Sequence, residues 1–498
     1  MPESARAALP EHGKEYPMKT IFEMGAPGRH AVMPAPLDVP AASLPDAVKR
    51  DTPLALPELS ELDVVRHFTQ LSRRNFGVDS HYYPLGSCTM KYNPKIMEAI
   101  GALPGFTRLH PFTAMTDAYR KICQGALEVV CEMERLLAEV SGMTAACLQP
   151  MAGAHGELTG ALLIAAYHKA QNGVLRDTLL IPDSAHGTNP ASAVMAGFKT
   201  VTIPSNAQGV VDFDAYAALM GEHVAGVMLT CPNTHGLFEP RVADMALLAH
   251  ENGALMYYDG ANLNAIVGRC RPGDLGFDVM HFNLHKTFAT PHGMGGPGSG
   301  AIAVGERLVP FLPNPRVVKD GGTYTLQDSA QSIGRIAPFF GNFLVALRAY
   351  AYLRAVGAEG LKTVSENAVL NANYVLARLR DVWRPAYDGL CMHECVLSAA
   401  TFASKHGIRA LDVAKALLDR GFHAPTVYFP LTVKEGLMIE PTETESRETL
   451  DAFCDAMLDI ARLAETDADV LHQAPRTMPV GRLNEAQAAK NLDCACTG

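Results

Sequence analysis

The sequence has no long apolar run. Its longest apolar stretches, such as residues 161–167, are far shorter than the roughly 20 residues that a membrane-spanning helix needs. The N-terminal segment also has no apolar core of the kind found in secretory signals. We therefore expect a soluble, cytoplasmic protein that does not contact a membrane.

The chain is also poor in charge. Charged residues make up 19% of the 498 residues and hydrophobic residues 48%, a core-rich composition that disfavours extensive disorder. The net charge of -10 provides no basic surface, so we expect no nucleic-acid partner. At about 150 residues per domain, the length predicts two or three domains.

The eleven cysteines form no visible disulfide framework. They are scattered and odd in number, as is typical of reduced thiols in a cytosolic enzyme. Cys391 and Cys395 flank His393 and could suggest a metal. No second pair of ligands stands at the spacing of a structural zinc site, so we favour packed or surface cysteines and expect no metal. Cys494 and Cys496 in the terminal tail could be exposed and oxidise.

Between about residues 120 and 310, apolar helices alternate with short apolar strands. Runs such as TLLIP (178–182), VAGVMLTCP (224–232) and ALMYYD (254–259) lack alternation, which is typical of strands covered on both faces. Strand and helix in turn predict an α/β fold with a mostly parallel sheet. After Gly341 the pattern changes to long helices and mixed segments, which indicates a smaller α+β domain.

The predicted domains are an N-terminal extended arm and loop (1–90), a large domain (91–345) and a small C-terminal domain with a tail (346–498). Residues 1–60 are rich in Pro and Ala, and alone they could not bury enough apolar surface to become ordered. Their regularly spaced Leu, Val and Pro residues favour packing on a partner subunit.

Four candidate site features follow strands, at the edge where open parallel sheets bind ligands. The first is the small-residue segment 153–156, containing Ala154 and His155, at the start of a helix. Free backbone amides there could bind a phosphate, although a tight turn without a ligand explains the segment equally well. The second is His186, just beyond the strand 178–182. Its ring could stack on an aromatic cofactor, although a loop histidine bonded to backbone is the simpler interpretation of His186 alone.

Asn189 and Pro190 follow His186 and resemble the N-cap and first residue of a helix. The third feature is Asp259, which ends an apolar strand. A carboxylate is costly to bury without a cationic partner, and a protonated pyridinium nitrogen is such a partner; an aspartate that caps the following turn is the alternative.

The fourth feature is Lys286, at the end of a strand and before the Gly-rich loop 291–300. A lysine there suits Schiff-base chemistry, and a solvated lysine is the alternative. Together His186, Asp259 and Lys286 describe a pyridoxal-phosphate (PLP) site. The lysine bonds the cofactor, the aspartate keeps the pyridine nitrogen protonated and the histidine covers the ring.

Seven segments closely resemble the glycine cleavage system P-protein, in particular subunit 2 of its two-subunit form. These segments are LGSCTMKYNP (85–94), QPMAGAHGELTG (149–160), PDSAHGTNPASA (182–193), YYDGANLNAI (257–266), HFNLHKTFATPHGMGGPGSG (281–300), SIGRIAPFFGN (332–342) and PTVYFPLTVKEGLMIEPTETE (425–445). The resemblance runs over nearly the whole chain, from about residue 20 to about residue 490.

The resemblance implies the fold type I of PLP-dependent transferases, with the cofactor in the large domain. It implies glycine decarboxylation followed by transfer of the aminomethyl group to the lipoyl disulfide of H-protein. It also implies a homologous partner, subunit 1. Lys286, His186 and Asp259 would be catalytic, and the further cofactor contacts would be Ala154, His155 and His285 at the phosphate and Asn262 at the ring hydroxyl.

Three alternatives stay open on the isolated residues. A cysteine desulfurase or a group II amino-acid decarboxylase would share the order of Asp259 and Lys286, whereas the long matching segments argue against both. A PLP-free scaffold subunit would not need these two residues.

The contacts to the glycine carboxylate are not evident. The candidates, for each of which packing or capping is the simpler interpretation, are His81, Tyr83, Ser87, Thr89, Arg335 and His393.

Overall fold

The computed structural model describes residues 19–491, apart from residues 34, 53, 173–175 and 294–297. The chain divides into two compact units, residues 1–80 with 473–498 and residues 81–472. The tail cysteines Cys494 and Cys496 lie outside the described residues.

In the first unit, the described residues between 19 and 60 have no regular secondary structure apart from two short 3-10 turns, η1 (Ile21–Glu23) and η2 (Asp46–Val48). The helix α1 (Glu61–Ser72) follows, and the side chain of Ser60 caps it by accepting the Asp63 amide at 3.1 Å. The short helix α16 (Glu485–Lys490) belongs to the same unit. Between residues 32 and 56, many large apolar side chains are exposed: Val32, Met33, Leu37, Val39, Leu44, Val48, Leu54 and Leu56.

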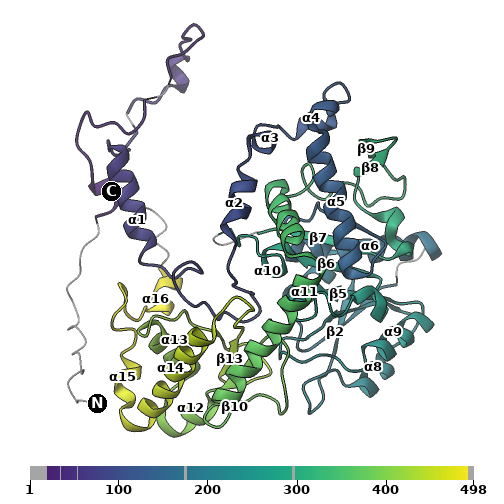
Figure 1. Cartoon of the computed structure of the whole chain (residues 1–498), viewed down its shortest axis with the longest axis vertical. Coiled ribbons are helices and arrows are strands. Elements are labelled where there is room, and N and C mark those ends of the chain that lie inside the picture. Colours follow the sequence, from purple (N-terminus) through teal and green to yellow (C-terminus); the bar gives the residue numbers. More distant parts are fainter. Residues whose placement is uncertain (1–18, 34, 53, 173–175, 294–297, 492–498) are drawn as a thin grey trace. The chain divides into compact units, whose positions relative to one another are not determined.

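The second unit is built on a seven-stranded sheet (Figure 1) with the order β1-β7-β6-β5-β4-β2-β3. The strands are β1 (Ala145–Cys147), β2 (Thr178–Pro182), β3 (Lys199–Ile203), β4 (Val224–Thr230), β5 (Leu255–Asp259), β6 (Val279–Asn283) and β7 (Gly300–Val304). Strands β2 to β6 are mutually parallel, and β7 runs antiparallel between β6 and β1. The predicted mostly parallel sheet is therefore confirmed.

Alternate residues of the central strands face two separate cores. Met256 and Tyr258 belong to one core, which includes Leu137 of α5 (Gln124–Ser141). Tyr257 belongs to the other, which includes Ile164 of α6 (Gly153–Asn172). Helices thus cover both faces, which explains why these strands are continuously apolar in sequence.

The remaining helices of this layer include α7 (Thr188–Met195), α8 (Phe213–Leu219) and α9 (Val242–Glu251). The prediction that Asn189 caps α7 is wrong. The helix begins at Thr188 with Gly187 at the N-cap, and the Asn189 side chain donates to Asp259 at 3.0 Å instead. A charge-assisted hydrogen bond from the Asn189 amide to the buried carboxylate of Asp259 is stronger than the neutral hydrogen bond that a helix cap would form.

A second sheet, in the order β10-β11-β13-β12, belongs to the C-terminal part. Its strands are β10 (Arg384–Pro385), β11 (Cys395–Ser398), β12 (Thr426–Val427) and β13 (Gly436–Ile439). It is accompanied by α12 (Ala400–His406), α13 (Ala410–Leu418), α14 (Arg447–Thr466) and α15 (Ala468–His472). The two helices predicted after Gly341 are both present within α11 (Phe343–Leu379), and they meet at Gly357, where the backbone leaves helical geometry with φ of 66°. A small sheet and helices thus make up residues 384–472, which belong to the same compact unit as the large sheet.

Shorter elements complete the unit. They are α2 (Lys95–Gly101), α3 (Pro104–Thr107), α4 (Phe112–Met115), η3 (Arg120–Cys123), η4 (Gly260–Ala265), η5 (Pro272–Leu275), α10 (Leu284–Thr287), η6 (Glu306–Phe311), and the hairpin of β8 (Arg316–Asp320) and β9 (Thr323–Gln327). In the part of the chain that the structure describes, no helix is long and apolar enough to cross a membrane.

Candidate active site

The carboxyl ends of β2, β4, β5 and β6 lie at one edge of the sheet because these strands are parallel. His186 follows β2, Asp259 ends β5 and Lys286 follows β6. The charges of Asp259 and Lys286 both act on His186, whose pKa is lowered chiefly by burial and further by Lys286. The structure therefore brings the three predicted residues to one place.

Lys286 lies in α10, the single turn after β6, and only 9% of it is exposed. Its Nζ donates to the backbone oxygen of Ser87 at 2.7 Å. Among the described residues, no carboxylate lies within ion-pairing distance of this nitrogen. A buried amine that is held by a carbonyl rather than by a carboxylate suits covalent bonding to an aldehyde.

Asp259 is buried, with 1% exposed. Its Oδ1 accepts the Ala261 amide at 2.9 Å, and its Oδ2 accepts from Asn189. Burial alone would raise the pKa of Asp259, but the positive potential of His281 and these hydrogen bonds outweigh burial, so the pKa is lowered. The carboxylate is thus held ionised in a dry place, as the partner of a pyridinium must be.

Tyr257 and His281 form a chain of polar contacts that ends at Asp259 and that sequence reasoning missed. We call Tyr257 with His281 the relay. The hydroxyl of Tyr257 lies 2.6 Å from Nδ1 of His281, and His281 Nε2 lies 3.5 Å from Asp259 Oδ1. Because the ionised Asp259 can only accept, the ring proton of His281 belongs on Nε2, directed at Asp259, and Nδ1 then accepts from the Tyr257 hydroxyl. Gly160 of α6 faces the ring of Tyr257 so closely that a Cβ there would lie 2.2 Å from it.

Glu157, also on α6, is the second carboxyl of this corner. Its Oε1 accepts from Thr188 at 2.8 Å, and its Oε2 is buried without a partner among the described residues. Burial, assisted by the negative charge of Asp259, raises the pKa of Glu157 to about 8. At neutral pH Asp259 therefore carries the charge and Glu157 the proton.

The predicted phosphate contacts surround the start of α6. Ala154 and His155 are in its first turn, where backbone amides have no intrahelical acceptor. A Cβ on Gly153 would lie 2.6 Å from Asn283, so the glycine permits this close approach. His285 Nδ1 lies 2.9 Å from the oxygen of Ser299, and burial lowers the pKa of His285 to about 3, so its ring is neutral.

Asn262 lies in η4, after β5, and is buried. Its Nδ2 donates to the oxygen of Pro232 at 2.9 Å, while its Oδ1 is buried without a partner among the described residues. An acceptor left free in this way fits the predicted contact to a hydroxyl group. The unpartnered Oδ1 of Asn262, the buried Lys286 and the free amides at the start of α6 together fit PLP.

Of the residues weighed for the glycine carboxylate, the structure brings Ser87, Thr89 and His393 to the Lys286 side. Tyr83 instead stacks on His423, with ring centroids 3.6 Å apart, and His81 acts electrostatically on the same His423. Arg335 is exposed.

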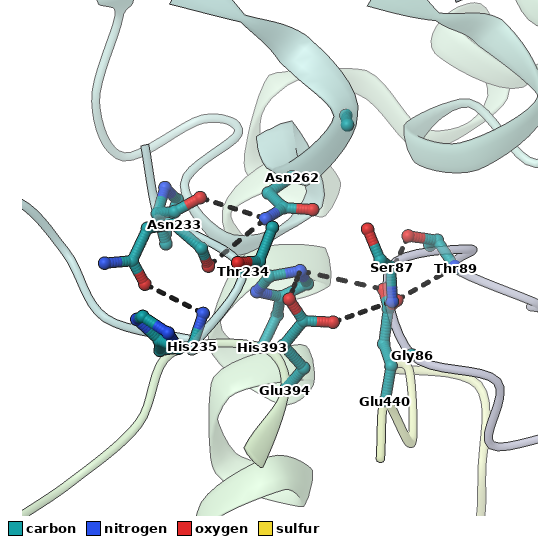
Figure 2. Close-up of polar contacts among 12 residues, drawn as sticks. Gly86, Ser87, Thr89, Asn233, Thr234, His235, Asn262, His393, Glu394 and Glu440 are labelled. Carbon is teal, nitrogen blue, oxygen red and sulfur yellow. Dashed lines mark hydrogen bonds and ion pairs between the residues drawn. The ribbon is translucent and has the colours of Figure 1, made fainter. Parts of the chain in front are cut away.

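Sequence reasoning also missed two buried glutamates. Figure 2 shows Glu394 and Glu440 meeting the loop of Ser87 and Thr89, with His393 beside them. Both glutamates border apolar strands, so the signal was a charge inside an otherwise apolar run.

A second buried lysine, Lys91, was missed as well. Its Nζ donates to Glu443 at 2.6 Å and to the oxygen of Thr287 at 2.7 Å. Burial lowers the pKa of Lys91, but Glu443 outweighs it and the pKa is raised. The charged Lys91 thus links Glu443 to α10, the helical turn that carries Lys286.

Two models of protein families match this chain. A model of the glycine cleavage system P-protein family matches residues 37–401, and a model of the glycine dehydrogenase C-terminal domain matches residues 364–476. The chain belongs to the glycine cleavage system P-protein family. It is 53% identical to a probable glycine dehydrogenase (decarboxylating) subunit 2 of Caldanaerobacter subterraneus subsp. tengcongensis, over 96% of this chain and 98% of the relative. The corresponding protein of Chlorobium chlorochromatii is 52% identical, over 96% and 99%.

Solved structures agree with the P-protein assignment. An inhibitor-bound glycine decarboxylase P-protein superposes with a TM-score of 0.68 at 25% identity, covering 84% of this chain and 93% of the other. A cysteine desulfurase of Thermococcus onnurineus superposes with 0.60 at 14% identity, over 77% and 95%. The second likeness concerns the fold alone, and together they confirm the predicted PLP-dependent fold type I.

Proposed function

We propose that this chain is the PLP-binding subunit of a two-subunit glycine dehydrogenase (decarboxylating), acting on glycine together with a homologous subunit 1. The observation that carries the proposal is the convergence of Lys286, Asp259 and His186 on one sheet edge. The names of the relatives support the choice of glycine and of a partner subunit.

When bound, PLP supplies an electron sink for the electron pair that remains when carbon dioxide leaves glycine. Asp259 would hold a proton on the pyridine nitrogen, and the Tyr257–His281 relay keeps Asp259 ionised. Lys286 would bond the cofactor, His186 would cover its ring, and the first turn of α6 would bind its phosphate. Asn262 would accept from the ring hydroxyl through its free Oδ1.

We further propose that the aminomethyl group passes to the lipoyl disulfide of H-protein. The attacked disulfide bond breaks, and its second sulfur leaves with the electron pair and takes up a proton, which gives an aminomethyl-dihydrolipoyl group. Ser87 contacts Lys286 and Lys91 contacts Thr287, so residues Leu85–Lys91 would shield the reacting carbon from water during this step.

The exposed apolar side chains of residues 32–56 support the proposal of a partner subunit. Monomeric proteins rarely expose so many apolar side chains along one segment. We propose that this arm packs on subunit 1, with a total buried area above roughly 2,000 Å², as in obligate complexes.

The test begins with an absorbance scan of the purified chain after addition of PLP, before and after borohydride reduction. We expect a visible band from lysine-bound PLP and, by mass spectrometry, a reduced adduct on Lys286. Lys286→Ala should stay folded and give no adduct, and an adduct in this variant would refute the lysine assignment. Glycine–bicarbonate carboxyl exchange, with and without subunit 1 and H-protein, then tests the reaction.

A further inference from the structure

Two buried carboxyls face each other because of the register of the small sheet. Strands β11 and β13 are antiparallel, and Cys395 pairs with Ile439. Glu394, one residue before Cys395, is therefore opposite Glu440, one residue after Ile439. Both side chains are fully buried. Like charges directly opposite each other destabilise a sheet, and in a dry place the cost is larger.

Each of these glutamates holds one strained residue of the neighbouring loop. Ser87 and Thr89 are left-handed, with φ of 61° and 49°, which is unfavourable for residues with a Cβ. The Ser87 amide donates to Glu394 Oε2 at 2.7 Å, and the Thr89 amide donates to Glu440 Oε2 at 2.9 Å. We call residues 87–89 the turn, and Glu394 with Glu440 the carboxyl clamp. Figure 2 shows the clamp meeting the turn.

The clamped turn is the acceptor of Lys286. Between the two held amides, the Ser87 carbonyl points to Lys286 and accepts Nζ at 2.7 Å. The residues just before the turn also contact the small sheet. Leu85 forms an antiparallel β-bridge with Ile439, and the backbone oxygen of Gly86 accepts from the hydroxyl of Thr426 at 2.8 Å. Loss of the clamp would therefore move the acceptor of the lysine without touching the lysine itself.

The hydrogen bonds also indicate where a proton belongs. Glu440 accepts from both the amide and the hydroxyl of Thr89, whereas Glu394 accepts only one bond and its Oε1 has no partner among the described residues. Hydrogen bonds to a carboxylate favour its ionised form. Burial raises the pKa of both groups, that of Glu440 to about 6 and that of Glu394 further, because Glu440 adds its negative charge.

The groups around the clamp fit one net negative charge. Burial, assisted by the charge of Lys286, lowers the pKa of His393 to about 3, so its ring is neutral, and its Nε2 lies 3.8 Å from Glu394 and 3.9 Å from Glu440. Lys286 is the positive group that acts on both carboxyls. The other titratable groups that interact with the clamp are Tyr82, Cys88, Cys391, Cys395 and Glu443.

A metal ion is the competing occupant, since ligand atoms of His393, Glu394 and Glu440 lie within 4.8 Å of one another. The charge of Lys286 acts on all three groups and opposes a cation there. A single proton relieves the repulsion between the carboxyls without adding a charge next to the lysine. It therefore fits the cluster better than a metal does.

We propose that the carboxyl clamp shares one proton, held on Glu394, and positions the turn so that the Ser87 carbonyl receives the Lys286 amine whenever that amine is not bonded to the cofactor. Glu394 and Glu440 are positioning residues in this assignment, because they act on the lysine through Ser87. The inference rests on the proposed function only for the role of Lys286.

The first test is hydrogen exchange, followed by mass spectrometry, of the peptide that covers the turn, in the full chain without PLP. Glu394→Gln should keep wild-type protection, because a glutamine amide replaces a protonated carboxyl. Glu440→Gln loses a charge-assisted acceptor and should exchange about tenfold faster. Glu394→Ala should exchange faster too, which makes Glu394→Gln the conservative rescue. Glu134→Gln removes a buried carboxyl that accepts the Leu148 amide elsewhere and should leave this peptide unchanged.

Equal exchange in Glu394→Gln and Glu440→Gln would overturn the assignment of the proton, and unchanged exchange in all clamp variants would overturn the clamp. Addition of Zn²⁺ or Mn²⁺ should leave the thermal midpoint of the chain unchanged. A metal-dependent rise of the midpoint that Glu394→Gln abolishes would favour a metal instead.

The second test uses the cofactor-loaded chain. Raising the pH ionises Glu394 beside Glu440 and should loosen the turn, so the visible band of lysine-bound PLP should change along an alkaline limb that Glu394→Gln removes. An identical pH profile in both proteins would contradict the proposal. If no variant binds PLP, the proposed function fails, while the exchange result still decides the clamp.

Discussion

Asp259→Asn tests the electrostatic centre of the proposed site. Asp259 is 1% exposed and accepts from Asn189 and Ala261, while His281 directs a proton at it from 3.5 Å. Asparagine keeps the shape of the side chain but removes its charge. Its NH₂ group also replaces one carboxylate oxygen, so that a donor faces the donors of Asn189, Ala261 or His281. We expect PLP to bind more weakly and glycine carboxyl exchange to fall about 10²–10³-fold, the usual effect of losing one preorganised electrostatic contact.

The same substitution has a readout that does not depend on the reaction. The charge of Asp259 helps to raise the pKa of Glu157 to about 8, so its removal should lower the pKa of Glu157. Titration of the Glu157 carboxyl by infrared difference spectroscopy, with Glu157→Gln to identify the band, would measure this shift.

Asp278→Asn is the matched control. Asp278 is also buried, accepts from His250 and from the Met256 amide at 2.8 Å each, and precedes β6 at the opposite edge of the same sheet. It should lower stability without changing the spectrum of bound PLP. Exchange activity near the wild-type rate in Asp259→Asn, or an equal loss in Asp278→Asn, would refute the proposed role.

Three further predictions follow from other parts of the structure. Tyr257→Phe removes the donor that fixes the His281 tautomer, which should lower unfolding stability by about 1–3 kcal/mol and shift the pH dependence of the PLP band; an unchanged band would contradict the relay. Burial raises the pKa of Glu134 to about 7, so the folded protein keeps this proton at a pH where the unfolded chain loses it. The free energy of unfolding of the wild type should therefore fall by up to about 3 kcal/mol as the pH rises from about 4.5 to 7. Urea unfolding at several pH values should show that Glu134→Gln lacks this decrease. Deletion of residues 1–50 should abolish association with subunit 1 in light scattering, and a fully active monomer would contradict the arm's role.

The fold was predictable because its signals are local. The parallel strands β2, β4, β5 and β6 are buried along their whole length, and this is visible in apolar runs such as 178–182 and 254–259. The edge at which His186, Asp259 and Lys286 lie follows from strand direction alone. The error at Asn189 arose because a local capping signal competed with a buried carboxylate 70 residues away, which the sequence does not reveal.

The two missed glutamates, Glu394 and Glu440, have partners that are distant in sequence, and their pairing depends on strand register. Glu394 is 307 residues from Ser87, and Glu440 is 351 residues from Thr89. A shift of one residue between β11 and β13 would turn one carboxyl to the other face, so no motif of either strand predicts the pair. That Glu394 and Glu440 hold one proton can nevertheless be argued from their burial. Two carboxyls that share a dry space with one lysine are stable only with one proton between them, so the cluster must respond to the charge of Lys286.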